Sequence, residues 1–65
     1  MKVKVIDRRG GAAVSLHDVS LEVEQEIDSA GRRVWICRRR DTQIGSALTK
    51  GEAVEIATAY LRKAR

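Results

Sequence analysis

The stretch that decides the fold is VSLEVEQEIDSAGRRVWIC, residues 19–37. Over its first nine residues, apolar side chains stand mostly at odd positions and glutamates at even positions, an alternation that predicts a half-buried strand. Asp28 and Gly31 stand first and fourth in the next four residues, which is the preference of a type I turn closed by a glycine bulge. The stretch therefore predicts an antiparallel hairpin.

The predicted turn also sets the pairing register of the hairpin, because it places Asp28 opposite Arg32. The pairs that follow are Val23 with Cys37, Gln25 with Trp35, and Glu22 with Arg38. In this register the core face carries Val19, Leu21, Val23, Trp35 and Cys37. The opposite face carries the glutamates together with Val34, Ile36, Arg38 and Arg40. A slip of one residue would exchange the two sets, so whether Trp35 or Val34 and Ile36 face the helix stays open at this point.

The segment before the hairpin is also β-like. Residues 2–7 alternate and are rich in β-branched side chains, which predicts a first strand. The paired glycines Gly10-Gly11 then mark a turn. From Ala12 to Ile27 the β-like pattern continues, but its apolar positions change from even to odd near His17-Asp18. Such a change requires a bulge or a split into two strands, and we predict one bent strand.

A helix is predicted at the C-terminal end, after a loop over residues 41–48. Thr49 and Glu52 have the spacing of a capping box, in which each side chain can satisfy a free backbone N–H at the helix start. The helix is expected from Lys50 to Lys63. Its apolar stripe comprises Ala53, Ile56, Ala57, Tyr60, Leu61 and Ala64, and the basic residues that favour its negative end are Arg62, Lys63 and Arg65.

These elements predict an α+β fold: a three-stranded antiparallel meander, with a bulged or split second strand, packed on one C-terminal helix. Proline is absent and there is no serine-rich linker, so residues 1–65 are expected to form a single small domain. A chain of this length buries only about 60% of the surface that it exposes when unfolded. We therefore expect a marginal core.

Composition excludes several classes of protein. Hydrophobic residues make up 43% and charged residues 34% of the chain, which favours a globular protein over a disordered one. No apolar run approaches the roughly 20 residues of a membrane span, and we expect neither a signal peptide nor a membrane partner. The single cysteine, Cys37, can form neither an internal disulfide nor a four-ligand zinc site, which favours a cytoplasmic location.

We expect no enzymatic activity, no cofactor and no metal. His17 is the only histidine and is far in sequence from Cys37, which the predicted register places in the core. The three glutamates of the hairpin stand on one strand face opposite arginines, as a solvated charge ladder does. Gly10-Gly11 is followed by neither a Lys-Ser/Thr pair nor a helix, so it does not form a phosphate loop.

The charge is unevenly distributed along the chain. The net charge is +4; residues 1–30 have four bases against six acids, and residues 31–65 have nine bases against three acids. In the predicted meander the first turn and the end of the third strand lie at the same end of the sheet. That arrangement brings five guanidinium groups together as a phosphate-binding cluster: Arg8, Arg9, Arg38, Arg39 and Arg40. The only two aromatic residues are expected in the core, so double-stranded DNA is favoured over single strands.

The second half of the chain resembles known families. Gly45, Thr49, Glu52 and Ala53 follow a strand containing Val34-Trp35-Ile36, an arrangement similar to the three-strand-plus-helix modules that bind DNA through their sheet. Examples are the plant ethylene-response-factor domain and the arm-binding domain of phage integrases. Residues 32–64 also resemble a family of uncharacterised bacterial domains with a Trp-containing strand, Thr-Lys-x-Glu-Ala and an Ala-rich helix. The resemblance implies this fold and, for the first two families, DNA binding.

The sequence therefore favours a small basic nucleic-acid-binding accessory protein, of the size typical of phages and mobile elements. The alternative is a protein-binding module or inhibitor of phage or plasmid type that acts through the open sheet face. In that case Val34 and Ile36 would form the partner interface, and a homodimer is one of its expected forms.

Overall fold

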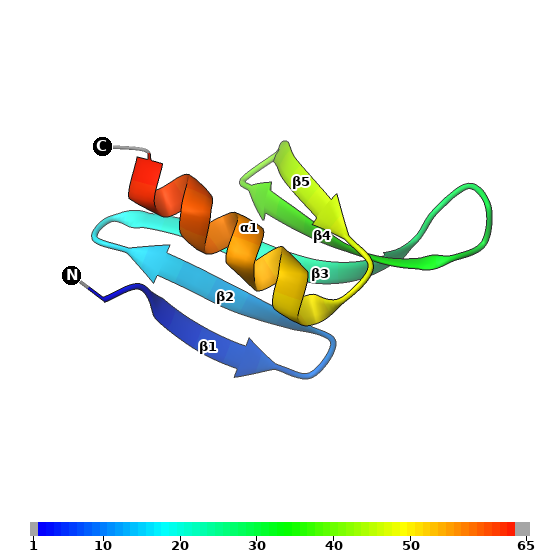
Figure 1. The fold of residues 1–65 in the computed structure, drawn as a ribbon, viewed down its shortest axis with the longest axis horizontal. Coiled ribbons are helices and arrows are strands. Elements are labelled where there is room, and N and C mark those ends of the chain that lie inside the picture. Colours follow the sequence, from blue (N-terminus) through cyan, green and yellow to red (C-terminus); the bar gives the residue numbers. More distant parts are fainter. Residues whose placement is uncertain (1, 64–65) are drawn as a thin grey trace.

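The computed structural model describes residues 2–63 of the chain and places six elements in them. Five strands form one antiparallel sheet in the order β1-β2-β3-β4-β5, with each strand beside its neighbours in sequence. One helix crosses one face of this sheet, so the molecule has two layers (Figure 1). The elements are β1 Lys4–Arg8, β2 Gly11–Leu16, β3 Val19–Ile27, β4 Arg33–Arg39, β5 Thr42–Ala47 and α1 Lys50–Lys63.

The predicted hairpin over residues 19–37 is confirmed, register included. Val23 pairs with Cys37 and Gln25 with Trp35, as the turn requires. Asp28 builds that turn: its backbone N–H donates to the carbonyl of Arg32 over 2.9 Å, and its Oδ1 accepts from two backbone N–H groups at 2.8 and 2.9 Å. Gly31 has a φ of 80°, a conformation that glycine adopts without steric cost.

The prediction of three strands is wrong, because the expected bent strand over residues 12–27 is two strands. Leu16 pairs directly with Val19, so His17 and Asp18 form a tight two-residue turn rather than a bulge. His17 adopts a φ of 56° in this turn, a left-handed conformation in which His, Asn and Asp are enriched among non-glycine residues. The change of apolar positions from even to odd is explained by this reversal of the chain.

The fifth strand replaces most of the predicted loop over residues 41–48. The chain reverses at Arg40, with a φ of 55°, and β5 then pairs with β4 from Thr42 to Ala47. A bulge next to Cys37 shifts the register, so that Cys37 faces Gly45 while Arg38 faces Gln43. The prediction failed here because this segment has no clear alternation, and its pairing partner is what holds it extended.

The helix is confirmed at its predicted bounds. The backbone N–H of Glu52 donates to Thr49 Oγ1 over 3.2 Å, and the Thr49 hydroxyl contacts the Glu52 carboxylate at the same distance. The buried helix residues are Ala53, Ala57 and Leu61, three members of the predicted apolar stripe. Ala64 and Arg65, which the sequence also assigned to the helix, lie outside the described residues.

The core lies between the helix and the sheet. It comprises eight buried residues, drawn from β2, β3, β4 and α1: Ala12, Val14, Leu21, Val23, Cys37, Ala53, Ala57 and Leu61. Trp35 is half-buried against this cluster, and Lys50 Nζ of the helix lies 5.8 Å from its ring centroid. Trp35 therefore faces the helix, whereas Val34 and Ile36 face away from it, on the open face of the sheet.

Candidate functional site

The predicted cluster of five arginines does not form at one end of the sheet. Arg8 and Arg9 lie at the β1–β2 turn, at the end from which the β3–β4 hairpin projects. Arg39 and Arg40 lie at the β4–β5 turn, at the opposite end (Figure 1). The reason is the tight turn at His17, because one additional reversal of the chain changes the end at which every later strand begins and ends.

Two of the five arginines are held in ion pairs on the open sheet face. Arg8 Nη1 lies 3.4 Å from Glu22 Oε2, and Arg38 Nη2 lies 2.8 Å from Glu26 Oε2. Arg38 also has a buried Nε–H for which the described residues provide no hydrogen-bond acceptor. These guanidinium groups already have carboxylate partners, so they are poorly placed to bind phosphates without first giving up those contacts.

The predicted partner interface is mostly covered within the chain itself. Val34 is half-buried and Ile36 is only 7% exposed. Arg38 follows Ile36 on the same face and reaches past it to Glu26, which pairs with Val34. An apolar pair on an open face is thus shielded by a neighbouring ion pair. A partner-binding role for Val34 and Ile36 stays a prediction.

The structure places a different set of basic residues toward one end of the molecule, which we call the basic end. The start of β1, the β4–β5 turn and the end of α1 lie toward the end opposite the hairpin, with β1 and β5 at the two edges of the sheet (Figure 1). Their six bases are Lys2, Lys4, Arg39, Arg40, Arg62 and Lys63. Among the described residues two acids, Asp18 and Asp41, lie in the turns at this end, and Glu22 lines a pocket beside Arg39 and Arg40. Six bases and seven acids are shared by the rest of the described chain.

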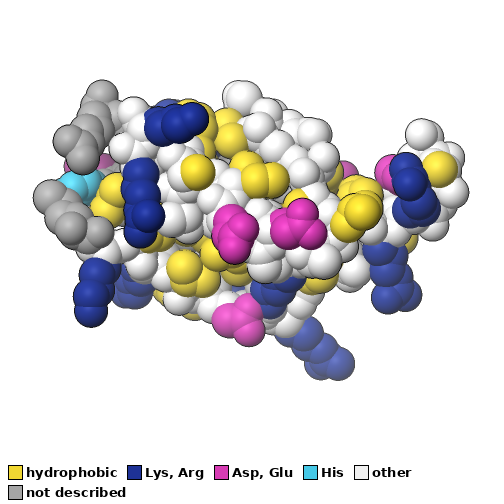
Figure 2. Space-filling model, in the orientation of Figure 1, with side chains coloured by type: hydrophobic (Ala, Val, Ile, Leu, Met, Phe, Trp, Pro, Cys, Tyr) yellow, Lys and Arg dark blue, Asp and Glu magenta, His cyan; other side chains and the backbone are white. Residues whose placement is uncertain are grey.

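The basic end is visible on the helix side of the molecule. Figure 2 shows Lys and Arg side chains both around the end at the left, where α1 ends, and toward the hairpin at the right, whereas most of the acidic side chains of this face lie in the middle and to the right. None of the six bases forms an ion pair with an acid in the part of the chain that the structure describes. The bases of this end therefore outnumber its acids and are not paired with them in the described residues.

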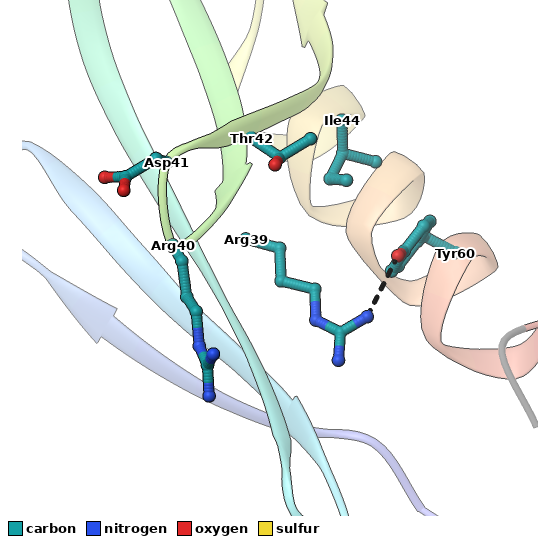
Figure 3. A pocket seen from close by; sticks show the side chains of 6 residues that line it. All are labelled: Arg39, Arg40, Asp41, Thr42, Ile44 and Tyr60. Carbon is teal, nitrogen blue, oxygen red and sulfur yellow. Dashed lines mark hydrogen bonds between the residues drawn. The ribbon is translucent and has the colours of Figure 1, made fainter.

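Arg39 is the best-positioned member of the basic end. Its Nη1 donates to the Tyr60 hydroxyl over 3.3 Å, and its guanidinium points toward the helix (Figure 3). Arg40 leaves the turn separately, and Asp41 points away from Tyr60 (Figure 3). An open pocket of about 440 Å³ lies here, and it is lined by Arg39, Arg40, Asp41, Thr42, Ile44 and Tyr60.

A second pocket shares both arginines. It measures about 380 Å³, and its other lining residues come from the β2–β3 turn and β3: Asp18, Val19, Ser20 and Glu22. Arg39 and Arg40 thus have hollows on either side of them. A guanidinium group presents five N–H donors, and the contact with Tyr60 accounts for one of those of Arg39. The remaining donors can bind the oxygens of an anion such as a phosphate.

The other residues considered for chemistry do not meet in a site. His17 is exposed in its turn, while Cys37 is buried at the centre of the core. Burial raises the pKa of the Cys37 thiol above its ordinary value. Among residues 2–63 no three His, Cys, Asp or Glu side chains are grouped as metal ligands would be. Within the same residues no helix is long and apolar enough to cross a membrane.

The sequence contained Lys2, Lys4, Arg62 and Lys63, but the prediction did not place them with the arginines. Arg62 and Lys63 were interpreted only as a favourable match to the helix dipole. Their position beside Arg39 depends on the direction in which α1 crosses the sheet. Lys50, at the helix start, contacts Asp7 and the Arg8 carbonyl, so the helix necessarily ends at the opposite side of the molecule.

A comparison with known proteins finds no matching family model, no matching curated protein and no matching solved structure. The resemblance to DNA-binding sheet-plus-helix modules and to the bacterial Trp-strand domains stays a prediction.

Proposed function

We propose that this chain is a small nucleic-acid-binding accessory protein whose basic end contacts the phosphates of double-stranded DNA. The observation that carries the proposal is the charge of that end, where six bases among the described residues stand against Asp18 and Asp41. A local excess of positive charge attracts a polyanion and accelerates its association. Arg39 and Arg40 are the residues that we assign to direct phosphate contacts, because both lack a carboxylate partner among the described residues.

The mode of binding that we propose is dominated by the nucleic-acid backbone. Trp35 packs against the core and Tyr60, a residue of α1, is half-buried, so the chain offers no row of exposed rings on which single-stranded bases could stack. The open sheet face presents Glu22, Glu24 and Glu26 and would repel a duplex laid across it. The basic end is thus a better candidate than the sheet face that the resemblance implied.

The test is the binding of a fluorescently labelled duplex of about 20 base pairs, followed by anisotropy at several salt concentrations. The wild-type protein is expected to bind with a Kd of about 10⁻⁴–10⁻⁶ M at physiological salt and more tightly at low salt. The variant Arg39→Gln/Arg40→Asn should bind more weakly. Its plot of log K against log salt should be flatter by about 0.9 for each phosphate that the variant no longer neutralises. Asparagine is chosen at position 40 because it tolerates a positive φ.

A matched control removes the same charge from the opposite end of the molecule. Arg9→Gln/Arg32→Gln also lowers the net charge by two, at two exposed positions near the β1–β2 and β3–β4 turns. We expect this variant to keep the wild-type salt slope. Equal losses in the two variants would show that binding follows total charge rather than a site. Absence of binding at low salt would reject the proposal itself.

The alternative function, a protein-binding module acting through the open sheet face, has less support. It needs an exposed apolar surface on that face, where Ile36 lies beneath Arg38 with 7% of its surface exposed and Ile6, on the edge strand β1, is 45% exposed. The paired acids and bases of this face also satisfy one another. The large apolar side chains that the structure leaves most exposed lie elsewhere, at Ile27 and Leu48.

A further inference from the structure

The β3–β4 hairpin projects beyond the rest of the sheet as a two-stranded arm, which we define as residues 26–34. The pairing of β2 with β3 ends at Glu24, and that of β5 with β4 ends at Trp35. The arm therefore has no neighbouring strand, and α1 does not extend over it (Figure 1). Because strand residues alternate, Ile27 and its partner Arg33 continue the face of the sheet that the helix covers farther back.

The apolar side chain on this face of the arm is one of the two most exposed large apolar side chains among the described residues. Ile27 is 63% exposed. Leu48 is 67% exposed and follows Ala47, which pairs with Trp35 at the base of the arm. In a chain with so small a core, covering the Ile27 side chain with a second surface would remove apolar area from water and so stabilise the protein.

The arm is held in one conformation by its turn. The Asp28 carboxylate accepts hydrogen bonds from the backbone N–H groups of Ala30 and Arg32, and its second oxygen lies 3.3 Å from Arg32 Nε. These contacts lower the pKa of the Asp28 carboxyl, the backbone hydrogen bond from Arg32 contributing most. A preorganised arm loses little conformational entropy on binding, which favours its use as a contact surface.

The shape of the molecule suits a second copy of itself. The helix forms a layer above the sheet and starts at the base of the arm without covering it, so each copy has a raised step beside an uncovered arm (Figure 1). In a two-fold arrangement with the second copy turned over, the helix start of the second copy would lie on the arm of the first. By symmetry, the helix start of the first copy would lie on the arm of the second. Such an interface is isologous and closes as a dimer.

The charges of the two surfaces are complementary. Arg33, on the same face of the arm as Ile27, has no acidic partner among residues 2–63. The outer side of the helix start is acidic, with Glu52 and Glu55 both exposed, and Glu55 is likewise without a basic partner in those residues. We propose that two copies of this chain associate arm to helix, with Ile27 covered by the helix start of the partner and Arg33 facing Glu55.

The proposal is independent of nucleic-acid binding, and its test uses the protein alone. The mass in solution is measured by sedimentation over a concentration series for the wild type and for Ile27→Asp, Arg33→Glu and Glu55→Arg. We expect the wild type to approach twice its monomer mass of 7.2 kDa. Ile27→Asp should weaken association by about tenfold or more, because it replaces the covered apolar side chain with a negative charge that faces the acidic helix start of the partner.

The charge-swapped variant Arg33→Glu/Glu55→Arg supplies the sharpest comparison. Each single reversal places like charges opposite each other and should weaken association, and the double variant should restore it in both symmetric halves. Val34→Glu, on the other face of the arm, is the matched control and should associate as the wild type does. Circular dichroism verifies that each variant is folded.

Two results would overturn the proposal. One is a wild type that stays monomeric up to about 1 mM. The other is an Ile27→Asp variant that associates as strongly as the wild type. That result would overturn the proposal whatever the effect of Val34→Glu. Since these measurements contain no nucleic acid, neither result tests DNA binding by the basic end. Failure of the DNA-binding proposal would likewise leave the proposed dimer unaffected.

Discussion

Arg39 donates a hydrogen bond to the hydroxyl of Tyr60 over 3.3 Å, and this contact joins the end of β4 to the last turns of α1. The two residues are 21 positions apart in the chain and come from different layers of the fold. The contact restrains one guanidinium at the basic end, while that of Arg40 leaves the turn separately (Figure 3). It thereby connects the packing of the helix with the site that we assign to phosphates.

The first prediction concerns this contact. Tyr60→Phe removes the acceptor and leaves the ring in place, so the free energy of unfolding should fall by no more than about 1 kcal/mol. Duplex binding should weaken about two- to tenfold, because nothing then orients the Arg39 guanidinium. In an Arg39→Gln background the same substitution should have no further effect on binding. An equal loss of duplex affinity in both backgrounds would show that Tyr60 does not act through Arg39.

A second prediction concerns the acids of the basic end. Asp41 lies in the turn beside Arg40, and its carboxylate opposes the approach of a phosphate. Asp41→Asn should tighten duplex binding by up to about fivefold, since exposed charges a few ångströms apart interact by about 1 kcal/mol in water. Anisotropy at low salt measures the change. Glu24→Gln, which removes a charge from the open sheet face, should leave affinity close to that of the wild type.

A third prediction contrasts two glycines. A Cβ at Gly11 would lie 2.3 Å from the carbonyl oxygen of Val23, so Gly11→Ala forces the β2–β3 ladder apart. We expect a loss of about 1–3 kcal/mol, observed as a fall of roughly 4–8 °C in Tm per kcal/mol. A Cβ added at Gly51, in the first turn of α1, would meet no atom within 4 Å. Gly51→Ala should stabilise the protein by about 0.5–1 kcal/mol. Thermal unfolding that ranked the two variants in the opposite order would contradict the packing described for β2.

A fourth prediction concerns acid stability. The pKa of Asp28 is lowered in the folded chain, first by the backbone hydrogen bond from Arg32. The contribution of this carboxylate is therefore fully present above its unfolded pKa of about 3.8 and is lost as the pH falls through its folded value. Chemical unfolding between pH 7 and pH 2 should show that Asp28→Asn flattens the acid limb of the stability curve. If the acid limbs of the wild-type and Asp28→Asn stability curves superimposed, the Asp28 carboxylate would not contribute to stability in this way.

Much of the fold could be predicted because short-range rules govern it. The hairpin register follows from Asp28 and Gly31, whose turn geometry permits one pairing. The helix begins after Thr49 because its side chain satisfies an N–H of the first turn. Alternation and capping both act within a few residues, so they are visible in the sequence alone.

The two turns that prediction missed carry weak local signals. His17 and Arg40 adopt positive φ values without being glycine or asparagine, and this costs conformational energy that pairing of the flanking strands offsets. For the first turn, the change of apolar positions from even to odd between Leu16 and Val19 is a sufficient signal. A split into two strands was the alternative explanation of that change. For the second turn we find no comparable signal, because residues 42–47 have no regular alternation.

The sequence by itself determined the α+β class, the hairpin with its register, the bounds of the helix and the excess of positive charge. Only the tertiary structure decided which of those charges share one end. Each reversal of the chain exchanges the two ends of the sheet for everything that follows, so the turn at His17 alone separates Arg39 and Arg40 from Arg8 and Arg9. The end of the sheet at which a side chain lies depends on the number of reversals that precede it. Local sequence patterns do not reveal that number.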